Sequence, residues 1–187
     1  MVQPVQFRKE VPSGLIRRLR PSELGLFRDH LLRLDRESRR DRFNGSIGDA
    51  FLKEYARRSF EQGATVLGYV QNGRVLGAAE LHERPELDPP TGEIAFSVEK
   101  ELQHRGLGSR LFELLIAHAR ALGYTRLHVT THPNNGAMRA LARKFAASLS
   151  FEEGETVGVI ELDASLSRGG ELAATHPAPP RRDAVPA

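Results

Sequence analysis

A glycine-rich turn between a strand pattern and a long helix pattern constrains the fold of this chain most strongly. The turn is Gln103-His104-Arg105-Gly106-Leu107-Gly108. Residues 93–98 before it have the composition of a strand, and apolar residues after it recur at helical spacing as far as Leu122. The first N–H groups of a helix lack an intrahelical partner and lie at the positive end of the helix dipole. The turn is therefore predicted to hold an anion such as a phosphate on its main chain.

The glycines alone do not identify the ligand. Gly106 and Gly108 lack a Cβ atom, which lets an anion approach the amides, but turns and helix starts also use glycine for structural reasons. A dinucleotide fingerprint is excluded because Leu111 stands where its third glycine belongs, and no Gly-Lys-Ser/Thr follows as a P-loop requires. A different anion has to explain the turn.

Length and composition indicate one domain. The 187 residues are 40% hydrophobic and 27% charged, which suits a single globular unit with a buried core. We expect this unit at residues 14–163, after an N-terminal extension at 1–13. Residues 164–187 are rich in Gly, Ala, Pro and Arg without periodicity, which predicts a disordered tail.

Charge and residue usage exclude several functions. The net charge is +3, from 27 Lys and Arg against 24 Asp and Glu, and no basic stripe with interleaved aromatics predicts nucleic-acid binding. The absence of cysteine excludes disulfides, cysteine metal sites and acyl transfer through a cysteine thiol. No segment has the pattern of a signal peptide or a membrane span, so we expect a cytoplasmic protein that does not bind membranes.

The first third of the chain predicts a strand and two helices. The strand is expected at residues 15–19, and the first helix is expected to begin at Pro21-Ser22-Glu23 with Ser22 as its cap. An arginine-rich connection at 36–42 then leads to a second helix that starts near Gly48-Asp49.

The middle of the chain predicts three antiparallel strands. Runs at 65–70 and 75–81 flank Asn72-Gly73, the preferred pair for a two-residue hairpin turn. A proline-rich loop follows, and a third strand starts near Glu93 and ends at the glycine turn.

The last part of the domain predicts a parallel crossover and a hairpin. The strand at 126–131 follows the long helix and should lie parallel to the strand before it, as in a right-handed crossover. A further helix is expected from Asn134-Asn135, and Phe151 with residues 157–162 can form a final hairpin.

Two segments of this pattern resemble the GNAT superfamily of acyl-CoA-dependent N-acetyltransferases. The first is Gln103-x-x-Gly106-x-Gly108, although Lys100 stands where the family commonly has proline. The second is residues 135–144, which resemble the family's Asn-x-x-[Ala/Met]-x-x-Leu-x-x-Lys segment. The resemblance implies an α+β fold over residues 14–163, with a mixed six- to seven-stranded sheet flanked by about four helices.

The resemblance also implies acetyl-CoA as cosubstrate, with its pyrophosphate on the backbone amides of the turn. The pantetheine arm would bond the main chain of the preceding strand as an added strand does. Cofactor contacts are assigned to Phe96, Ser97, Val98, Gln103, His104, Arg105, Gly106, Leu107, Gly108, Ser109, Asn135 and Met138. Asn135 could instead be only a helix cap, and Met138 only a core residue. No metal is expected, because His128 and His132 have no carboxylate companion.

Glu93 is the expected general base. It stands ten residues before Gln103, close to where the protein-lysine acetylating branches of the family place a catalytic glutamate. Burial beside the acyl group would raise its pKa toward working pH, and a water could relay the proton. Glu80 on the neighbouring strand is the second candidate and could instead position the substrate. Glu93 could also be only a polar residue at a strand start.

No general acid is evident. Many relatives carry a tyrosine seven residues after the helix-start asparagine, where this chain has Ala142. The thiolate would leave unassisted or be protonated through water, and His132 is a possible substitute. A backbone N–H near Val98 is expected to bind the developing oxyanion.

The segment at 30–43 resembles bacterial protein-lysine acetyltransferases, in which a Glu-Ser pair precedes Arg-Phe. The expected acceptor is therefore a primary amine, such as a protein lysine, that attacks the thioester directly. A small metabolite amine is one alternative. Another is a non-catalytic acyl-CoA-binding regulatory module, which the alanine at position 142 keeps open. The chain is expected to be a monomer or a homodimer.

Overall fold

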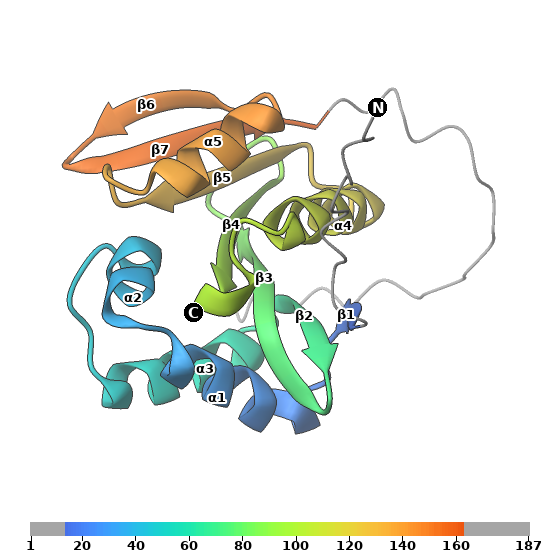
Figure 1. Cartoon of the computed structure of the whole chain (residues 1–187). Helices are drawn as coiled ribbons and strands as arrows, with labels where there is room; N and C mark the ends of the chain where they lie inside the picture. Colours follow the sequence, from blue (N-terminus) through green and yellow to red (C-terminus); the bar gives the residue numbers. More distant parts are fainter. Residues whose placement is uncertain (1–13, 163–187) are drawn as a thin grey trace, which may run out of the picture.

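A seven-stranded mixed sheet with the order β1-β2-β3-β4-β5-β7-β6 forms the centre of the protein (Figure 1). The computed structural model describes residues 14–162, so the expected extension at 1–13, residue 163 and the expected tail at 164–187 lie outside the described residues. The strands are β1 (Leu15–Arg18), β2 (Thr65–Gln71), β3 (Arg74–Arg84), β4 (Thr91–Val98), β5 (Arg126–Thr131), β6 (Ser148–Glu152) and β7 (Glu155–Glu161).

Five α-helices are described, where about four were expected. They are α1 (Leu24–Arg33), α2 (Arg36–Phe43), α3 (Asp49–Glu61), α4 (Leu107–Ala121) and α5 (Gly136–Lys144), with short 3₁₀ turns at Pro21–Glu23 and Lys100–Leu102. Within residues 14–162, no helix combines the length and the apolar character that crossing a membrane requires.

The hairpin at Asn72-Gly73 is confirmed. Asn72 and Gly73 both have positive φ, 51° and 73°, as the turn that matches strand twist requires. β2 and β3 pair on either side of it from Gln71↔Arg74 to Thr65↔Leu81. The expected α+β fold with three antiparallel strands before the glycine turn is therefore correct.

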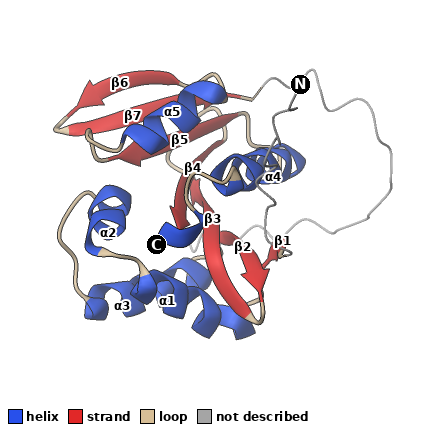
Figure 2. Cartoon of the chain, viewed as in Figure 1, coloured by secondary structure: helices blue, strands red, loops and turns tan. Residues whose placement is uncertain are grey.

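Helices cover the two faces of the sheet in separate groups, as Figure 2 shows. On one face, apolar residues of α4 and α5 pack against alternate residues of the central strands, among them Leu81, Ile94 and Leu127. On the other face, α1 and α3 pack against Val66 and Ala78. Side chains that alternate along β3 and β4 therefore point into different helix layers.

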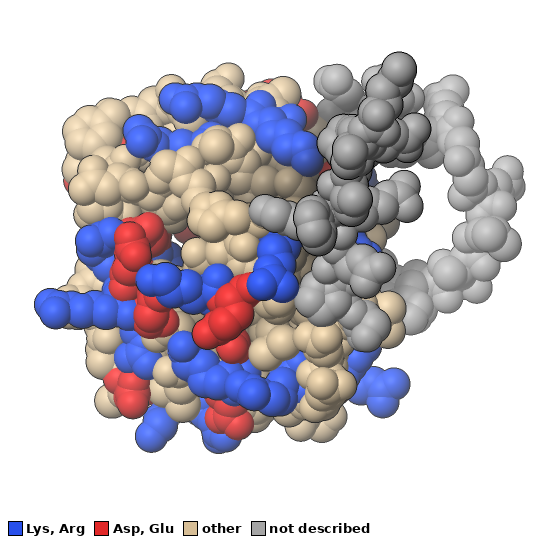
Figure 3. Space-filling view, viewed as in Figure 1, with Lys and Arg blue, Asp and Glu red and all other residues tan. Residues whose placement is uncertain are grey.

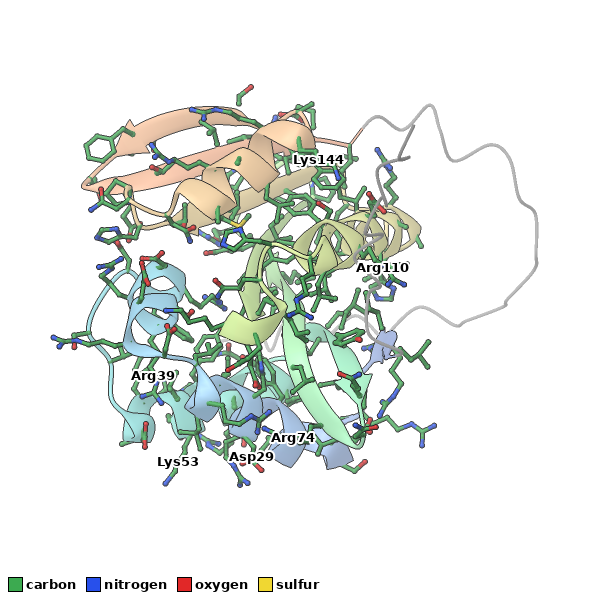
Figure 4. The ribbon with its side chains drawn as sticks, in the orientation of Figure 1. Asp29, Arg39, Lys53, Arg74, Arg110 and Lys144 are labelled. Atoms are coloured by element: carbon green, nitrogen blue, oxygen red, sulfur yellow. The ribbon has the colours of Figure 1, made fainter. Side chains whose placement is uncertain are left out.

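The expected connection at 36–42 is wrong, because these residues form α2. The Asp35 side chain caps the helix by accepting from the Ser38 N–H at 2.7 Å. Arg39 donates to the carbonyl oxygens of Leu32 and Leu34 at 2.6 and 2.9 Å, and its label in Figure 4 lies between α2 and the layer of α1 and α3. α2 has no buried apolar residue, so it lacks the apolar periodicity that reveals a helix in a sequence.

The expected cap of the first helix is also wrong. The Ser22 side chain makes no capping bond, and the Glu23 side chain instead accepts from the Arg20 N–H at 3.0 Å. Pro21–Glu23 form a 3₁₀ turn before α1 begins at Leu24.

β4 and β5 are parallel, as expected, but they pair over only three positions. The pairs are Thr91↔Arg126, Gly92↔Leu127 and Glu93↔His128. Beyond them, residues 94–98 of β4 stay paired with β3, and residues 129–131 of β5 stay paired with β7. The sheet therefore opens between β4 and β5, and one edge of each strand has no strand partner there (Figure 1).

Candidate functional site

The glycine turn lies at the N-terminus of α4, beside this opening. Gly106 is the cap residue and has φ of +82°, while His104 has φ of +59°. A Cβ atom at Gly106 would meet nothing within 4 Å, so its backbone conformation is the reason for glycine at this position. Among the described residues, none accepts a hydrogen bond from the N–H groups of His104 to Ser109. The turn therefore presents consecutive unpaired main-chain donors to an anion.

The side chain of Gln103 holds the turn in place. Its Nε2 donates to the carbonyl oxygen of Val98 at 3.0 Å and to the Ser38 hydroxyl at 3.2 Å. Lys100, which stands where the family has proline, lies in a 3₁₀ turn with its ammonium 3.3 Å from Asp35. The contacts of Gln103 with Ser38 and of Lys100 with Asp35 tie the turn to the start of α2.

Asn135 and Met138 have the structural roles that the sequence left open. Oδ1 of Asn135 accepts from the Met138 N–H at 2.9 Å and caps α5. Its Nδ2 donates to Thr131 Oγ1 at 3.0 Å and to the carbonyl oxygen of Asp41 at 3.4 Å. Met138 is buried in the core beside α4. Asn135 therefore connects β5, α5 and α2 across the opening.

Phe96, Ser97 and Val98 lie on the unpaired stretch of β4. Phe96 stacks on Phe112 of α4 with ring centroids 4.7 Å apart, so it belongs to the core on that face. Ser97 points to the opposite face, where its hydroxyl lies 2.9 Å from Nε2 of His30. Because both side chains have partners within the protein, these residues can offer main-chain groups to a ligand.

His30 is fully buried between Ser97 and Glu99. Its Nδ1 lies 3.2 Å from Glu99 Oε1, which also accepts from Arg33 at 2.9 Å. Burial raises the pKa of Glu99, but hydrogen bonds with His30 and Arg33 outweigh it and lower the pKa below its ordinary value. Burial lowers the pKa of His30 despite this carboxylate. This chain of contacts fixes α1 to the end of β4.

Glu93 lies at the last paired position before the opening, but its environment differs from the expected one. The expected burial is wrong: its side chain is 35% exposed, and Oε2 accepts from Nη1 of Arg84 at 2.5 Å. The ion pair fixes one carboxylate oxygen and leaves the side chain partly open to solvent.

Glu80 is fully buried in a network with residues from α2 and α3. Its Oε1 accepts from Arg42 Nη2 at 2.8 Å and its Oε2 from the Tyr55 hydroxyl at 2.7 Å. His82 Nε2 lies 3.1 Å from the same Oε2. Burial raises the pKa of Glu80, but the charge of Arg42 and the hydrogen bond from His82 outweigh it, and the pKa is about 2. Glu80 is therefore an ionised carboxylate with both oxygens occupied.

Sequence reasoning missed three members of this network, namely Arg42, Tyr55 and His82. Arg42 and Tyr55 lie 38 and 25 residues before Glu80, so no local spacing connects them. His82 could have been found, because residues two apart on a strand share a face. Glu80 lies in the predicted run at 75–81, and His82 is the first residue after that run, within the observed β3.

Among the described residues, the side chains considered for the general acid have contacts of their own. Ala142 is buried in the core of α4 and α5. Tyr55 belongs to the Glu80 network, and Tyr69 is fully buried. Nδ1 of His132 accepts from the Asn134 N–H at 3.1 Å, which gives this histidine a role in its own loop.

Two further surface features lie over the helical part of the protein that includes α2. A hollow lies beside α2 and is lined by Leu34, Arg36, Arg39, Ser46 and Ile47. On the face in Figure 3, acidic and basic side chains lie next to one another over the part formed by the helices α1 to α3. No expected site residue lines the hollow.

Comparisons with known proteins agree with this arrangement. The family described as acetyltransferase (GNAT) family matches residues 29–147, more than half of the chain. The GNAT domain of PAT from S. lividans is 21% identical, with a TM-score of 0.68 over 80% of this chain and 90% of that one. Ribosomal-protein-S5-alanine acetyltransferase from Vibrio fischeri is 14% identical, with a TM-score of 0.65 over 82% and 96%. The acetyltransferase yncA from Salmonella typhimurium, solved with its cofactor acetyl-CoA, is 18% identical, with a TM-score of 0.59 over 84% and 98%.

Proposed function

The chain belongs to the acetyltransferase (GNAT) family, and from this we propose that it transfers an acetyl group from acetyl-CoA to a primary amine. The amine attacks the thioester directly, without a covalent enzyme intermediate, because the chain has no cysteine to carry the acyl group. One observation carries the proposal: an unpaired strand edge lies beside a turn of unpaired main-chain donors.

The residues at this place fit acetyl-CoA. The N–H groups of His104 to Ser109 suit the pyrophosphate, because they combine free donors with the positive end of a 15-residue helix. The edge of β4 at Phe96, Ser97 and Val98 suits the amides of the pantetheine arm, as in strand addition. yncA was solved with this cofactor, which supports the same choice here.

Acetyl-CoA supplies an activated acyl group, and the chain supplies position and proton transfer. A backbone N–H near Val98 is proposed to stabilise the charge that develops on the carbonyl oxygen. Glu93 is proposed as a general base that takes a proton from the attacking nitrogen, directly or through a water. It stands on β4 where the opening begins. Glu80 is proposed as a positioning residue, because it is buried and both of its oxygens accept hydrogen bonds from the protein.

A protein lysine is the proposed acceptor. The support is the resemblance of residues 30–43 to bacterial protein-lysine acetyltransferases, and these residues include α2, which spans the opening. A small amine is the alternative acceptor.

A thiol-release assay with acetyl-CoA tests the function. The panel contains a lysine peptide, free amino acids and a polyamine, and CoA should be released only when an accepted amine is present. Calorimetry with CoA runs in parallel. If CoA binds tightly and no amine is acetylated, the chain is a binding module and not an enzyme.

A further inference from the structure

His82 lies beside both carboxylates that the sequence singled out. Glu80 precedes it by two residues on β3, and Glu93 is its register partner on β4. Directly opposed residues of antiparallel strands have Cβ atoms about 5 Å apart. Because Glu93 also pairs with His128, the row runs across the sheet at the last position before β4 and β5 separate.

The hydrogen bonds of His82 assign its proton to one ring nitrogen. Nε2 lies 3.1 Å from Glu80 Oε2 and 3.3 Å from the Tyr55 hydroxyl. The ionised Glu80 can only accept, and the Tyr55 hydroxyl already donates its proton to Glu80. Nε2 must therefore be the N–H, and Nδ1 carries a lone pair in the neutral ring.

Nδ1 of His82 is free to take a proton. Within residues 14–162 no group makes a hydrogen bond to it, and the side chain is 22% exposed. A carboxylate that accepts a hydrogen bond from one ring nitrogen of an imidazole also stabilises the imidazolium that forms when the other ring nitrogen is protonated. Glu80 is in that position.

We propose that the acetyl transfer uses His82, positioned by Glu80, as a base in addition to Glu93. His82 takes the first of two protons from the incoming ammonium group. The proposal rests on the function proposed above. A lysine ammonium carries three protons, and its nitrogen must lose one to expose a lone pair and another after the C–N bond forms. Nδ1 of His82 takes the first proton, and Glu93 takes the second. One of these protons passes through water to the leaving thiolate, and the other passes to solvent.

A histidine suits the first transfer better than a carboxylate. The ordinary pKa of a lysine ammonium is about 10.4, and that of an imidazole, about 6.5, is closer to it than the 4.3 of a glutamate. The second proton leaves a nitrogen that has already bonded to the acyl carbon and is more acidic, so a carboxylate can accept it. The titratable and charged groups that face this row are Glu80 and Arg84 from β3, Glu93 from β4, His128 from β5, Arg42 from α2 and Tyr55 from α3.

Two acceptors that differ mainly in basicity test the assignment, with each variant compared with the wild type on the same acceptor. One is a short lysine peptide, and the other is the same peptide with two fluorine atoms on Cδ of the lysine, which lowers the pKa of the ammonium to near neutrality, so that a far larger fraction of the amine is already neutral at pH 7. The variant is His82→Gln, whose amide can still donate to Glu80 but cannot act as a base. His118→Gln on α4 is the control, because this histidine lies near Thr65 of β2 and away from the opening.

We expect His82→Gln to lower kcat/KM for the lysine peptide by about 100-fold at pH 7 and for the fluorinated peptide by about threefold or less. Raising the pH to 9 should restore much of the loss, because more lysine is then neutral in solution. Equal losses on both peptides, or no loss on either, would overturn the proposal.

The tautomer of His82 is a readout that does not depend on activity. Nitrogen NMR of the imidazole in the protein without acetyl-CoA should find the proton on Nε2 at neutral pH. A proton on Nδ1 would contradict the assignment. If the wild-type chain acetylates no amine, the proposed function fails. If the wild type is active and His82→Gln does not discriminate between the peptides, only the role of His82 fails.

Discussion

Arg42 and Glu80 form an ion pair inside the protein, with Nη2 of the guanidinium 2.8 Å from Oε1 of the carboxylate and side-chain exposures of 13% and 0%. Removing one member of a buried pair leaves the other charge without compensation. Arg42→Met should therefore lower the free energy of unfolding by about 3–5 kcal/mol. Urea denaturation measures this, and Arg57→Met, which removes exposed pairs with Glu54 and Glu61 on α3, is the control and should change stability little. A small effect of Arg42→Met would mean that Glu80 is not ionised in the folded protein.

The same carboxylate predicts how acid acts on stability. The pKa of Glu80 is lowered from 4.5 to about 2. A group with a lowered pKa in the folded state stabilises above its unfolded pKa, and that stability is lost as the pH falls toward the folded pKa. The contribution of Glu80 should thus be complete above pH 4.5 and decline between 4.5 and about 2. Urea midpoints measured from pH 6 to 3 should fall less steeply for Arg42→Met than for the wild type, and identical slopes would argue against the assignment.

The turn at Gly106 can be tested with a matched glycine. Gly63, after α3, has φ of +78° against +82° for Gly106, and a Cβ atom would be free of contacts at both positions. Leucine at either position should cost about 1–2 kcal/mol of stability from left-handed strain. Only Gly106→Leu should also weaken CoA binding, by about tenfold or more. Calorimetry measures the affinity of each variant for CoA. Equal affinity in the two variants would contradict the assignment of the pyrophosphate to the turn.

Glu93 can be compared with Glu86, because both carboxylates bind Arg84. Glu93→Gln should lower kcat by about 100-fold with either amine peptide, since it removes the proposed acceptor of the second proton. Glu86→Gln should leave kcat near the wild-type value, because Glu86 lies in the loop between β3 and β4. Turnover of Glu93→Gln at the wild-type rate across the pH range would show that Glu93 is not a base.

Local signals in the sequence predicted most of the fold. Asn72-Gly73 determines its hairpin because both residues adopt positive φ. The glycine turn begins its helix in a similar way, because Gly106 also adopts positive φ. α2 was missed because its support comes from a side-chain cap and from Arg39 bonds to preceding carbonyls, with no buried apolar stripe. These contacts are visible in the structure and leave no pattern in the sequence, so the position of α2 was not predictable.

The candidate site was predictable as far as it depends on main chain. The order of strand, turn and helix placed the anion donors and the strand edge next to each other. The side-chain chemistry was less accessible, because the environment of Glu80 depends on Arg42 and Tyr55 from two other helices. The exposure of Glu93 likewise depends on Arg84 from the neighbouring strand.

The helix α2 has a mechanical consequence for the opening in the sheet. Ser38 contacts Gln103 next to the end of β4, the Asp41 carbonyl accepts from Thr131 and Asn135 at the end of β5, and Asn44 beyond the helix bonds Glu155 of β7. Where the backbone ladder between the two strands is missing, this one helix supplies the coupling instead. The two halves of the sheet thus keep their spacing through side chains, and single substitutions on α2 can adjust the width of the opening while the strands that form it stay unchanged.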